Sequence, residues 1–159
     1  MKTIKFNAPC HIGDTIYYVW AREKNNKYTF KMKKRVACGF LIEDFRQCVC
    51  VKDKSGTDGT IDIPMHCVST NKYIIKAAYK NLVAANKKSG PSDTHSTKTY
   101  AKLSESISVK SEYELGERFI NRYKEQDTVT GILVRNENDI ASVLGEDGGV
   151  YSFLELEKD

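Results

Sequence analysis

The chain has 159 residues, of which 40% are hydrophobic and 29% are charged, and this composition excludes a wholly disordered protein. No apolar run approaches the roughly 20 residues that span a bilayer, and the N-terminus lacks the apolar stretch of a secretory signal, so we expect a cytoplasmic protein that does not enter membranes. Five cysteines, an odd number, exclude a pure disulfide scaffold and indicate reduced thiols.

The net charge of +4 conceals a strong asymmetry along the chain. Residues 1–90 hold 17 Lys and Arg against 7 Asp and Glu, a net charge of +10. Residues 91–159 hold 8 against 14, a net charge of −6. Such asymmetry favours an anionic partner for the first part, and attraction between the two parts is the alternative.

The first part of the chain predicts five strands and then one helix. Period-two alternation and β-branched or aromatic residues predict strands at 15–20, 27–33, 36–42, 47–51 and 61–63. The polar residues 22–26 form the tip of a hairpin between the first two strands. A helix is predicted from a cap at Ser69, Thr70 or Asn71 to about Gly90. It has an apolar stripe and a separate stripe of lysines at Lys72, Lys76 and Lys80.

A polar stretch containing Gly90-Pro91 then predicts a linker, because residues 87–97 have no apolar periodicity. We therefore divide the chain into three segments. They are a basic β-barrel module with a C-terminal helix (1–88), a flexible linker (89–108) and an acidic small β module (109–159).

The acidic module repeats landmarks of the first module. Gly13-Asp14 corresponds to Gly116-Glu117, and the mid-strand Gly39 corresponds to Gly131. One alternative is that these landmarks recur by chance. Another is that residues 111–123 form a helix, although Gly116 in its interior argues against it. We expect a mainly β protein with one or two helices, built as two small SH3-like barrel modules in tandem.

The first module resembles small phage and mobile-element proteins of low-GC bacteria. The resemblance rests on Gly13-Asp14 and the aromatic strand after it, on Gly39, on residues 48–51 and on the helix from Thr70, and it covers about half of the chain. SH3-like barrels, including nucleic-acid-binding ones of the KOW and Tudor type, are similar in strand plan. The resemblance implies a barrel fold and a phage or mobile-element origin, and by analogy such an origin favours an inhibitor of a host or anti-phage defence protein.

The cysteines and histidines form a candidate metal site. Cys10-His11, Cys48-x-Cys50 and His66-Cys67 would supply ligands if the ends of the first barrel met. A C-x-C pair on a strand places its sulfurs about 6.5 Å apart, which is wide for one tetrahedral ion, so we expect core thiols and no metal or cofactor. No motif for nucleophilic catalysis or phosphate binding occurs, and we do not expect an enzyme.

The strongest candidate site is the basic hairpin. Its cations are Arg22, Lys24, Lys27, Lys31, Lys33, Lys34 and Arg35, and its aromatic residues are Trp20, Tyr28 and Phe30. Cations neutralise phosphates and exposed aromatic rings stack on bases, and the helix lysines Lys72, Lys76 and Lys80 would extend the positive surface. The alternation equally fits Tyr28, Phe30 and Met32 facing the core and the lysines facing solvent.

These observations predict a non-catalytic protein whose basic first module binds nucleic acid or another polyanion. The alternative is a phage or mobile-element inhibitor that binds an acidic host protein or an anti-phage defence protein.

Overall fold

The computed structural model describes residues 1–52, 59–89 and 102–159, and within them the protein is mainly β with one α-helix. The strands are β1 (Lys2–Ala8), β2 (Thr15–Lys24), β3 (Lys27–Glu43), β4 (Gln47–Lys52), β5 (Thr60–Pro64), β6 (Glu105–Ser111), β7 (Arg118–Ile120), β8 (Gln126–Val134), β9 (Ser142–Gly145), β10 (Val150–Tyr151) and β11 (Glu157–Lys158). The helix is α1 (Lys72–Ser89), and two 3-10 turns are η1 (Met65–Cys67) and η3 (Phe153–Glu155). No helix in this part of the chain is long and apolar enough to cross a membrane.

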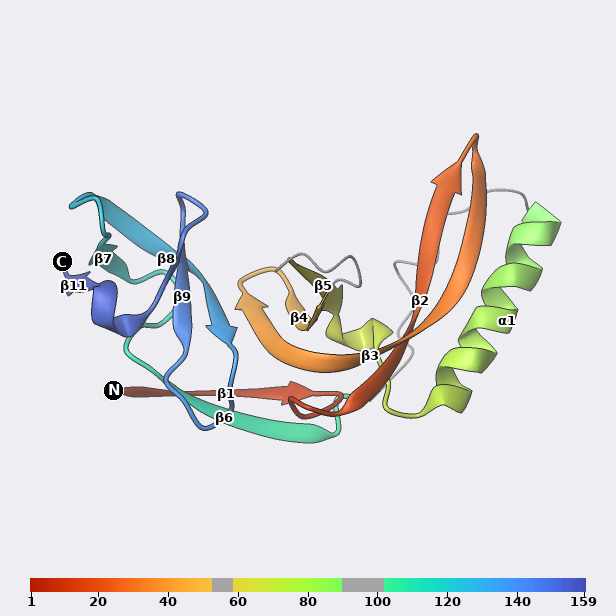
Figure 1. The fold of residues 1–159 in the computed structure, drawn as a ribbon, viewed down its shortest axis with the longest axis horizontal. Coiled ribbons are helices and arrows are strands. Elements are labelled where there is room, and N and C mark those ends of the chain that lie inside the picture. Colours follow the sequence, from red (N-terminus) through yellow and green to blue (C-terminus); the bar gives the residue numbers. More distant parts are fainter. Residues whose placement is uncertain (53–58, 90–101) are drawn as a thin grey trace.

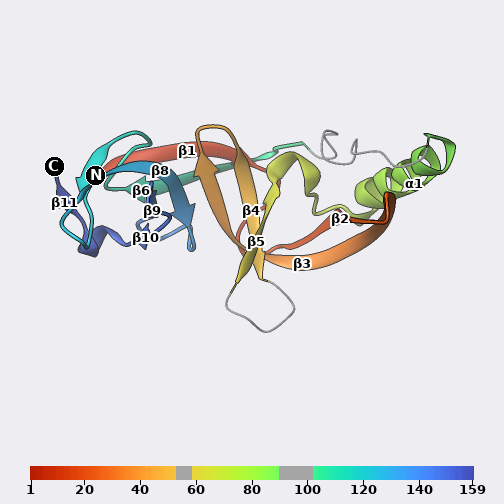
Figure 2. The ribbon, with the colours of Figure 1, turned by 90° about the horizontal axis from the view of Figure 1, so that it is seen from above.

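Most strands belong to one open antiparallel sheet that both parts of the chain share. Its order is β10-β9-β8-β3-β4-β5, with β2 paired to β3 and β7 paired to both β8 and β11. A separate ribbon of β1 and β6 runs along the other strands (Figure 1). The molecule is elongated, with the β2–β3 hairpin and α1 at one end and both chain termini at the other (Figures 1 and 2).

The core is continuous across the two parts. One cluster of buried side chains includes Phe6 and Phe40 from the first part and Ile107 and Ile132 from the second. The rings of Phe6 and Phe40 meet edge to face, with centroids 5.3 Å apart. The expected segments 1–88 and 109–159 therefore share a core and a sheet in this structure, because β1 pairs with β6 and β3 pairs with β8.

The predicted linker needs a partial correction. Residues 105–108, which we assigned to the linker, belong to β6. Their alternation places Ile107 in the core and exposes Ser106 and Ser108. Residues 90–101 of the predicted linker lie outside the described residues.

The same backbone turn occurs at both glycine-acidic pairs. Gly13 and Gly116 have φ of +97° and +85°, a region that suits glycine because it has no Cβ. The N–H of Gly13 donates to the Ala37 carbonyl at 2.8 Å, and that of Gly116 donates to the Val129 carbonyl at 2.9 Å. In the opposite direction, the N–H of Ala37 donates to the Asp14 carbonyl, and the N–H of Val129 donates to the Glu117 carbonyl. Both distances are 2.9 Å.

The correspondence continues beyond these turns. A β-bulge precedes each mid-strand glycine, Gly39 in β3 and Gly131 in β8. A 3-10 turn follows the last strand of each meander, η1 after β5 and η3 after β10. After η1, the chain forms a β-bridge to β2 between Ser69 and Tyr17. In the second part, the chain after η3 forms β11, which pairs with β7 in the same way.

Two ladders, β3–β8 and β1–β6, join the two parts of the chain. If every residue is replaced by its counterpart in the other part, each ladder keeps the same set of residue pairs. In the β3–β8 ladder Leu41 faces Leu133, and the neighbouring pairs are Phe40 with Val134 and Ile42 with Ile132. In the β1–β6 ladder Lys5 faces Ser108, and the outer pairs are Lys2 with Ser111 and Ala8 with Glu105. This pattern is expected when an approximate two-fold axis relates the two parts of the chain. The axis passes near the pairs Leu41–Leu133 and Lys5–Ser108, in which each residue faces its own counterpart.

The elements decide three of the sequence predictions. The helix at 72–89 is confirmed, and the side-chain oxygen of Asn71 caps it by accepting the Tyr73 N–H at 3.0 Å. The rival helix at 111–123 is wrong, since β7 lies there and Gly116 occupies the turn before it. The strands predicted at 27–33 and 36–42 are one long strand, β3.

Candidate nucleic-acid interface

The β2–β3 hairpin extends well beyond the core. Its ladder runs from Thr15–Val36 to Lys24–Lys27, and Asn25 and Asn26 form the turn. Both asparagines have positive φ, 53° and 60°, which is the backbone geometry of a type I′ turn and matches the twist of the flanking strands. The sequence prediction of a hairpin with its tip near residues 22–26 is confirmed.

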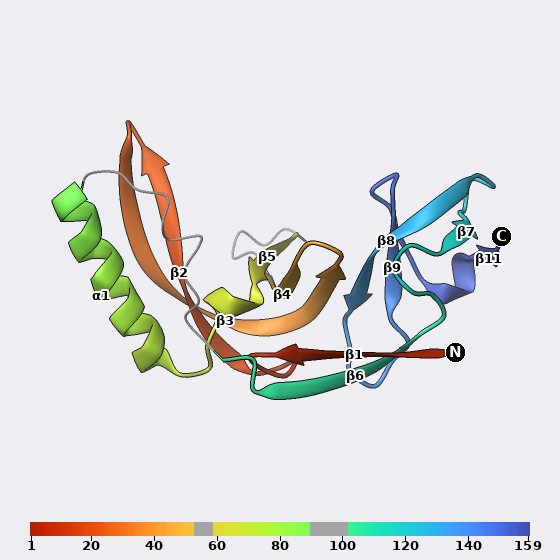
Figure 3. The same ribbon diagram turned by 180° about the vertical axis from the view of Figure 1, so that it is seen from behind.

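One face of the hairpin packs under α1. Residues opposite each other in an antiparallel pair share a face, so Ala21 and Phe30 lie on the same side as Val19 and Met32. Helix α1 contacts both strands and buries Ile75 and Leu82 completely or nearly so. Figure 3 shows the hairpin between α1 and the middle of the molecule. This packing fixes the hairpin, since the helix buries apolar surface along it.

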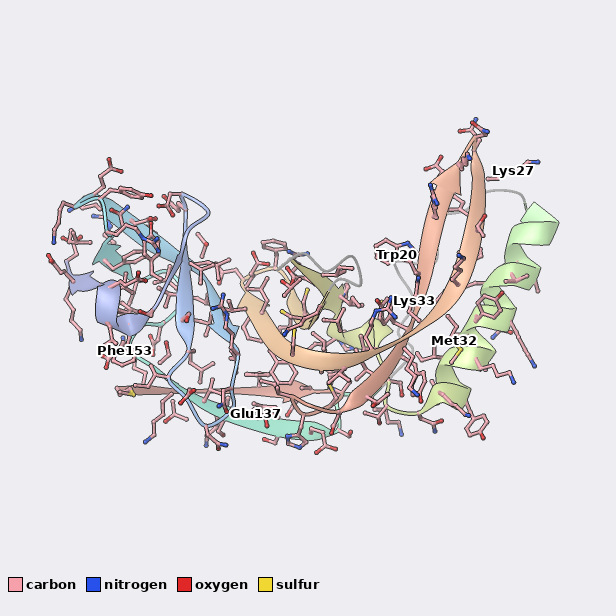
Figure 4. The ribbon with its side chains drawn as sticks, viewed as in Figure 1. Trp20, Lys27, Met32, Lys33, Glu137 and Phe153 are labelled. Atoms are coloured by element: carbon pink, nitrogen blue, oxygen red, sulfur yellow. The ribbon has the colours of Figure 1, made fainter. Side chains whose placement is uncertain are left out.

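The opposite face of the hairpin carries the candidate site. It presents the pairs Tyr18–Lys33, Trp20–Lys31 and Arg22–Thr29. A hollow of about 320 Å³ lies there, and we call its lining residues the basic face: Trp20, Arg22, Lys24, Thr29, Lys31 and Lys33. Trp20 is 42% exposed. Figure 4 shows Trp20 and Lys33 on this side of the hairpin and Met32 on the side of α1.

The basic face has no neutralising partner among the described residues. The ion pairs of the described residues have their cations at Lys2, His11, Arg46, Arg122 and Lys124. None of them involves a cation of the hairpin. The only acidic residue between positions 15 and 42 is Glu23, which pairs with Tyr28 and so belongs to the α1 side. The positive charge of the hollow is therefore available to an external anion.

The remaining predicted cations lie away from the hollow. Lys34 is exposed and shares the α1 side with Tyr17, and Lys27 lies at the end of the hairpin. The guanidinium of Arg35 donates to the Lys34 carbonyl at 2.8 Å, while its Nε is buried and has no hydrogen-bond partner among the described residues. The helix lysines Lys72, Lys76 and Lys80 are exposed on α1, with the hairpin between them and the basic face.

The predicted aromatic contacts need a correction. Phe30 is only 7% exposed and Tyr28 is half-buried, and their rings stack with centroids 6.3 Å apart on the α1 side. Neither ring lines the hollow, and among the described residues Trp20 is the aromatic side chain in its lining. The sequence analysis missed Thr29, although its period-two position opposite Arg22 placed it on the same face.

The candidate metal ligands come from three segments: Cys10 and His11 follow β1, Cys48 and Cys50 lie in β4, and His66 and Cys67 lie in η1. Among the described residues no group of three or more His, Cys, Asp or Glu side chains is arranged to hold a metal ion. Cys10, Cys48 and Cys50 are buried, and all five cysteines are free thiols. Burial raises the pKa of Cys10 to about 12 and that of Cys48 to about 11. The buried thiols Cys10, Cys48 and Cys50 therefore pack as small apolar side chains.

Comparisons with protein-family models, with curated proteins and with solved structures find no match for this chain.

Proposed function

We propose that the protein binds nucleic acid through the basic face of the β2–β3 hairpin. The observation that carries the proposal is the exposed Trp20 in a hollow rimmed by Arg22, Lys24, Lys31 and Lys33, none of them in an ion pair within the described residues. The cations would contact phosphates, and the indole would stack on a base. Because paired bases are stacked inside a duplex and are not free to stack on the ring, contact with Trp20 favours single strands.

The repeated backbone arrangement supports a second part of the proposal, that each part of the chain is one SH3-like unit. The hairpin extension and α1 would then be additions to the first unit, and the second unit lacks both. The acidic second part, at net −6, would repel nucleic acid and confine binding to the basic face.

The test uses the intrinsic fluorescence of Trp20, which is the single tryptophan of the chain. Titration with a single-stranded oligonucleotide should quench it, and a duplex of the same length should bind more weakly. Affinity should fall with salt by a log–log slope of about −0.7 per phosphate contacted on a single strand. With a labelled oligonucleotide, Trp20→Ala should bind about 5- to 150-fold more weakly, the range expected for one base stack.

A charge-matched pair of variants separates the site from general electrostatics. Lys24→Glu/Lys31→Glu/Lys33→Glu should abolish binding, whereas Lys72→Glu/Lys76→Glu/Lys80→Glu changes the net charge equally on α1 and should weaken it much less. Equal losses in the two triple variants would contradict the proposal. Absence of quenching by any nucleic acid, with specific capture of an acidic protein instead, would favour the inhibitor alternative.

A further inference from the structure

A second hollow lies on the outer face of the central sheet, away from the basic face. It has a volume of about 390 Å³, and β3, β4, β5 and the end of β8 surround it. Beneath it, Leu41, Cys48 and Cys50 form a buried cluster separate from the main core, with Cys38, Leu133 and Leu144 packed around them. β4 and β5 lie in the middle of the molecule (Figure 2), so this hollow is remote from the hairpin tip.

The floor of this hollow is apolar. It consists of Cys38, Gly39, Cys50 and Leu133. Burial raises the pKa of both thiols, so they are neutral. The Cys38 thiol donates to the Cys50 carbonyl at 3.2 Å, and the Cys50 thiol is hydrogen-bonded to the Asp62 carboxylate. Both thiol protons are therefore engaged, and the floor offers mainly van der Waals contact to a ligand.

The rim of the hollow is cationic. Lys52, Thr60 and Arg135 complete its lining, and all three residues are exposed. Neither cation forms an ion pair with a described residue. A guanidinium and an ammonium above an apolar floor suit a ligand with an anionic group at one end and an apolar body at the other.

The second part of the chain supplies an internal control. Gly39 pairs with Cys50, and the matched Gly131 pairs with Leu144, so a leucine stands where the hollow has a cysteine. Glu43 pairs with Gly131, and its side chain approaches to 3.4 Å of where a Cβ on that glycine would lie. The equivalent position thus has a larger side chain in place of Cys50 and a carboxylate in place of Arg135.

We propose that this hollow binds a small organic anion that has an aromatic or aliphatic body, with Lys52 and Arg135 contacting the anionic group. Its volume lies at the lower end of the roughly 300–1,000 Å³ typical of small-molecule sites, which limits the ligand to a small molecule. The inference is independent of nucleic-acid binding, because the two hollows share no residue.

The test uses the full chain and the apolar anion 8-anilinonaphthalene-1-sulfonate, whose fluorescence rises in apolar sites. Wild type should bind one equivalent saturably. Cys50→Leu should abolish binding by filling the floor as Leu144 does, and Arg135→Glu should weaken it at least tenfold without touching the core. Lys31→Glu on the basic face should leave the affinity unchanged.

Two controls keep the result decisive. Leu144→Cys should open the matched position without creating a probe site, because Glu43 stands at its rim. Loss of probe binding in Lys31→Glu, or binding by Arg135→Glu as tight as wild type, would overturn the proposal, as would the absence of saturable binding.

Discussion

Gly39 and Gly131 occupy matched positions, yet the space around them differs. A Cβ on Gly39 would lie 2.6 Å from the backbone oxygen of Val134, because β8 approaches β3 closely at that point. A Cβ on Gly131 would meet only side-chain atoms, at 3.4 Å or more, which is ordinary contact. A side chain can move aside, but the Val134 carbonyl is held by the sheet.

Gly39→Ala should therefore destabilise the protein by about 1–3 kcal/mol, the usual cost of overpacking. Gly131→Ala should be neutral or stabilise it by up to about 1 kcal/mol, because alanine restricts the unfolded chain. Denaturant unfolding of both variants checks this, and equal losses in the two would show that the contact of Gly39 with β8 is not tight.

The sequence indicated both glycines but not the reason for them. A glycine within a strand marks a bulge or a close approach of another backbone, and both features occur here. Which backbone approaches Gly39 depends on the β3–β8 ladder, which joins residues far apart in the sequence. Likewise, period-two alternation placed Phe30 and Lys31 on opposite faces, but the burial of Phe30 depends on α1.

At the scale of elements, an ion-pair arrangement closes each end of the β1–β6 ribbon. Lys2 at one end pairs with Glu117. At the other end His11 lies between two carboxylates, with Nδ1 3.0 Å from Glu137 and Nε2 3.1 Å from Glu105. Only the imidazolium can donate from both ring nitrogens at once. The hydrogen bonds to Glu137 and then to Glu105 raise the pKa of His11 above its usual value.

This shift predicts a pH dependence of stability. Because the pKa of His11 is higher in the folded state, its contribution is fully present below the unfolded pKa of about 6.5 and is lost as pH rises through the folded pKa. The destabilisation caused by His11→Gln should therefore shrink between pH 5.5 and 8. The effect should be small, since the imidazole is about half exposed.

Lys2→Gln at the other end of the ribbon is the matched control. Ordinary lysine and glutamate side chains do not titrate between pH 5.5 and 8, so its effect on the melting temperature should be constant over that range. A His11→Gln effect equally independent of pH would contradict the bridging role of the imidazolium.

The ribbon is also the element that sequence reasoning missed. Ile4, Phe6 and Ala8 alternate with polar residues, as do Ile107 and Val109, so each strand had a recognisable pattern. The pairing of β1 with β6 had no local signal, because almost the whole of the first part of the chain lies between these two strands in the sequence. The expectation of a flexible linker up to residue 108 arose from that gap.

At the scale of the whole molecule, the two oppositely charged parts are joined by strand pairing as well as by the chain itself. The seven residue pairs of β1–β6, the β3–β8 ladder and the shared core all connect them. Two modules on a flexible tether would separate once the tether was cut. Two parts that complete one core would remain associated, because separation would expose apolar side chains and unpaired strand edges.

Insertion of a site-specific protease sequence between Ser92 and Asp93 distinguishes these arrangements. After cleavage the two fragments should co-elute in size-exclusion chromatography at the volume of the uncut protein and unfold in a single transition. The +10 and −6 charges of the two parts should assist the association, so high salt should weaken it only slightly while the buried core persists. Elution as two independent folded species would contradict the shared core. It would also restore the arrangement of two tethered modules that the sequence first indicated.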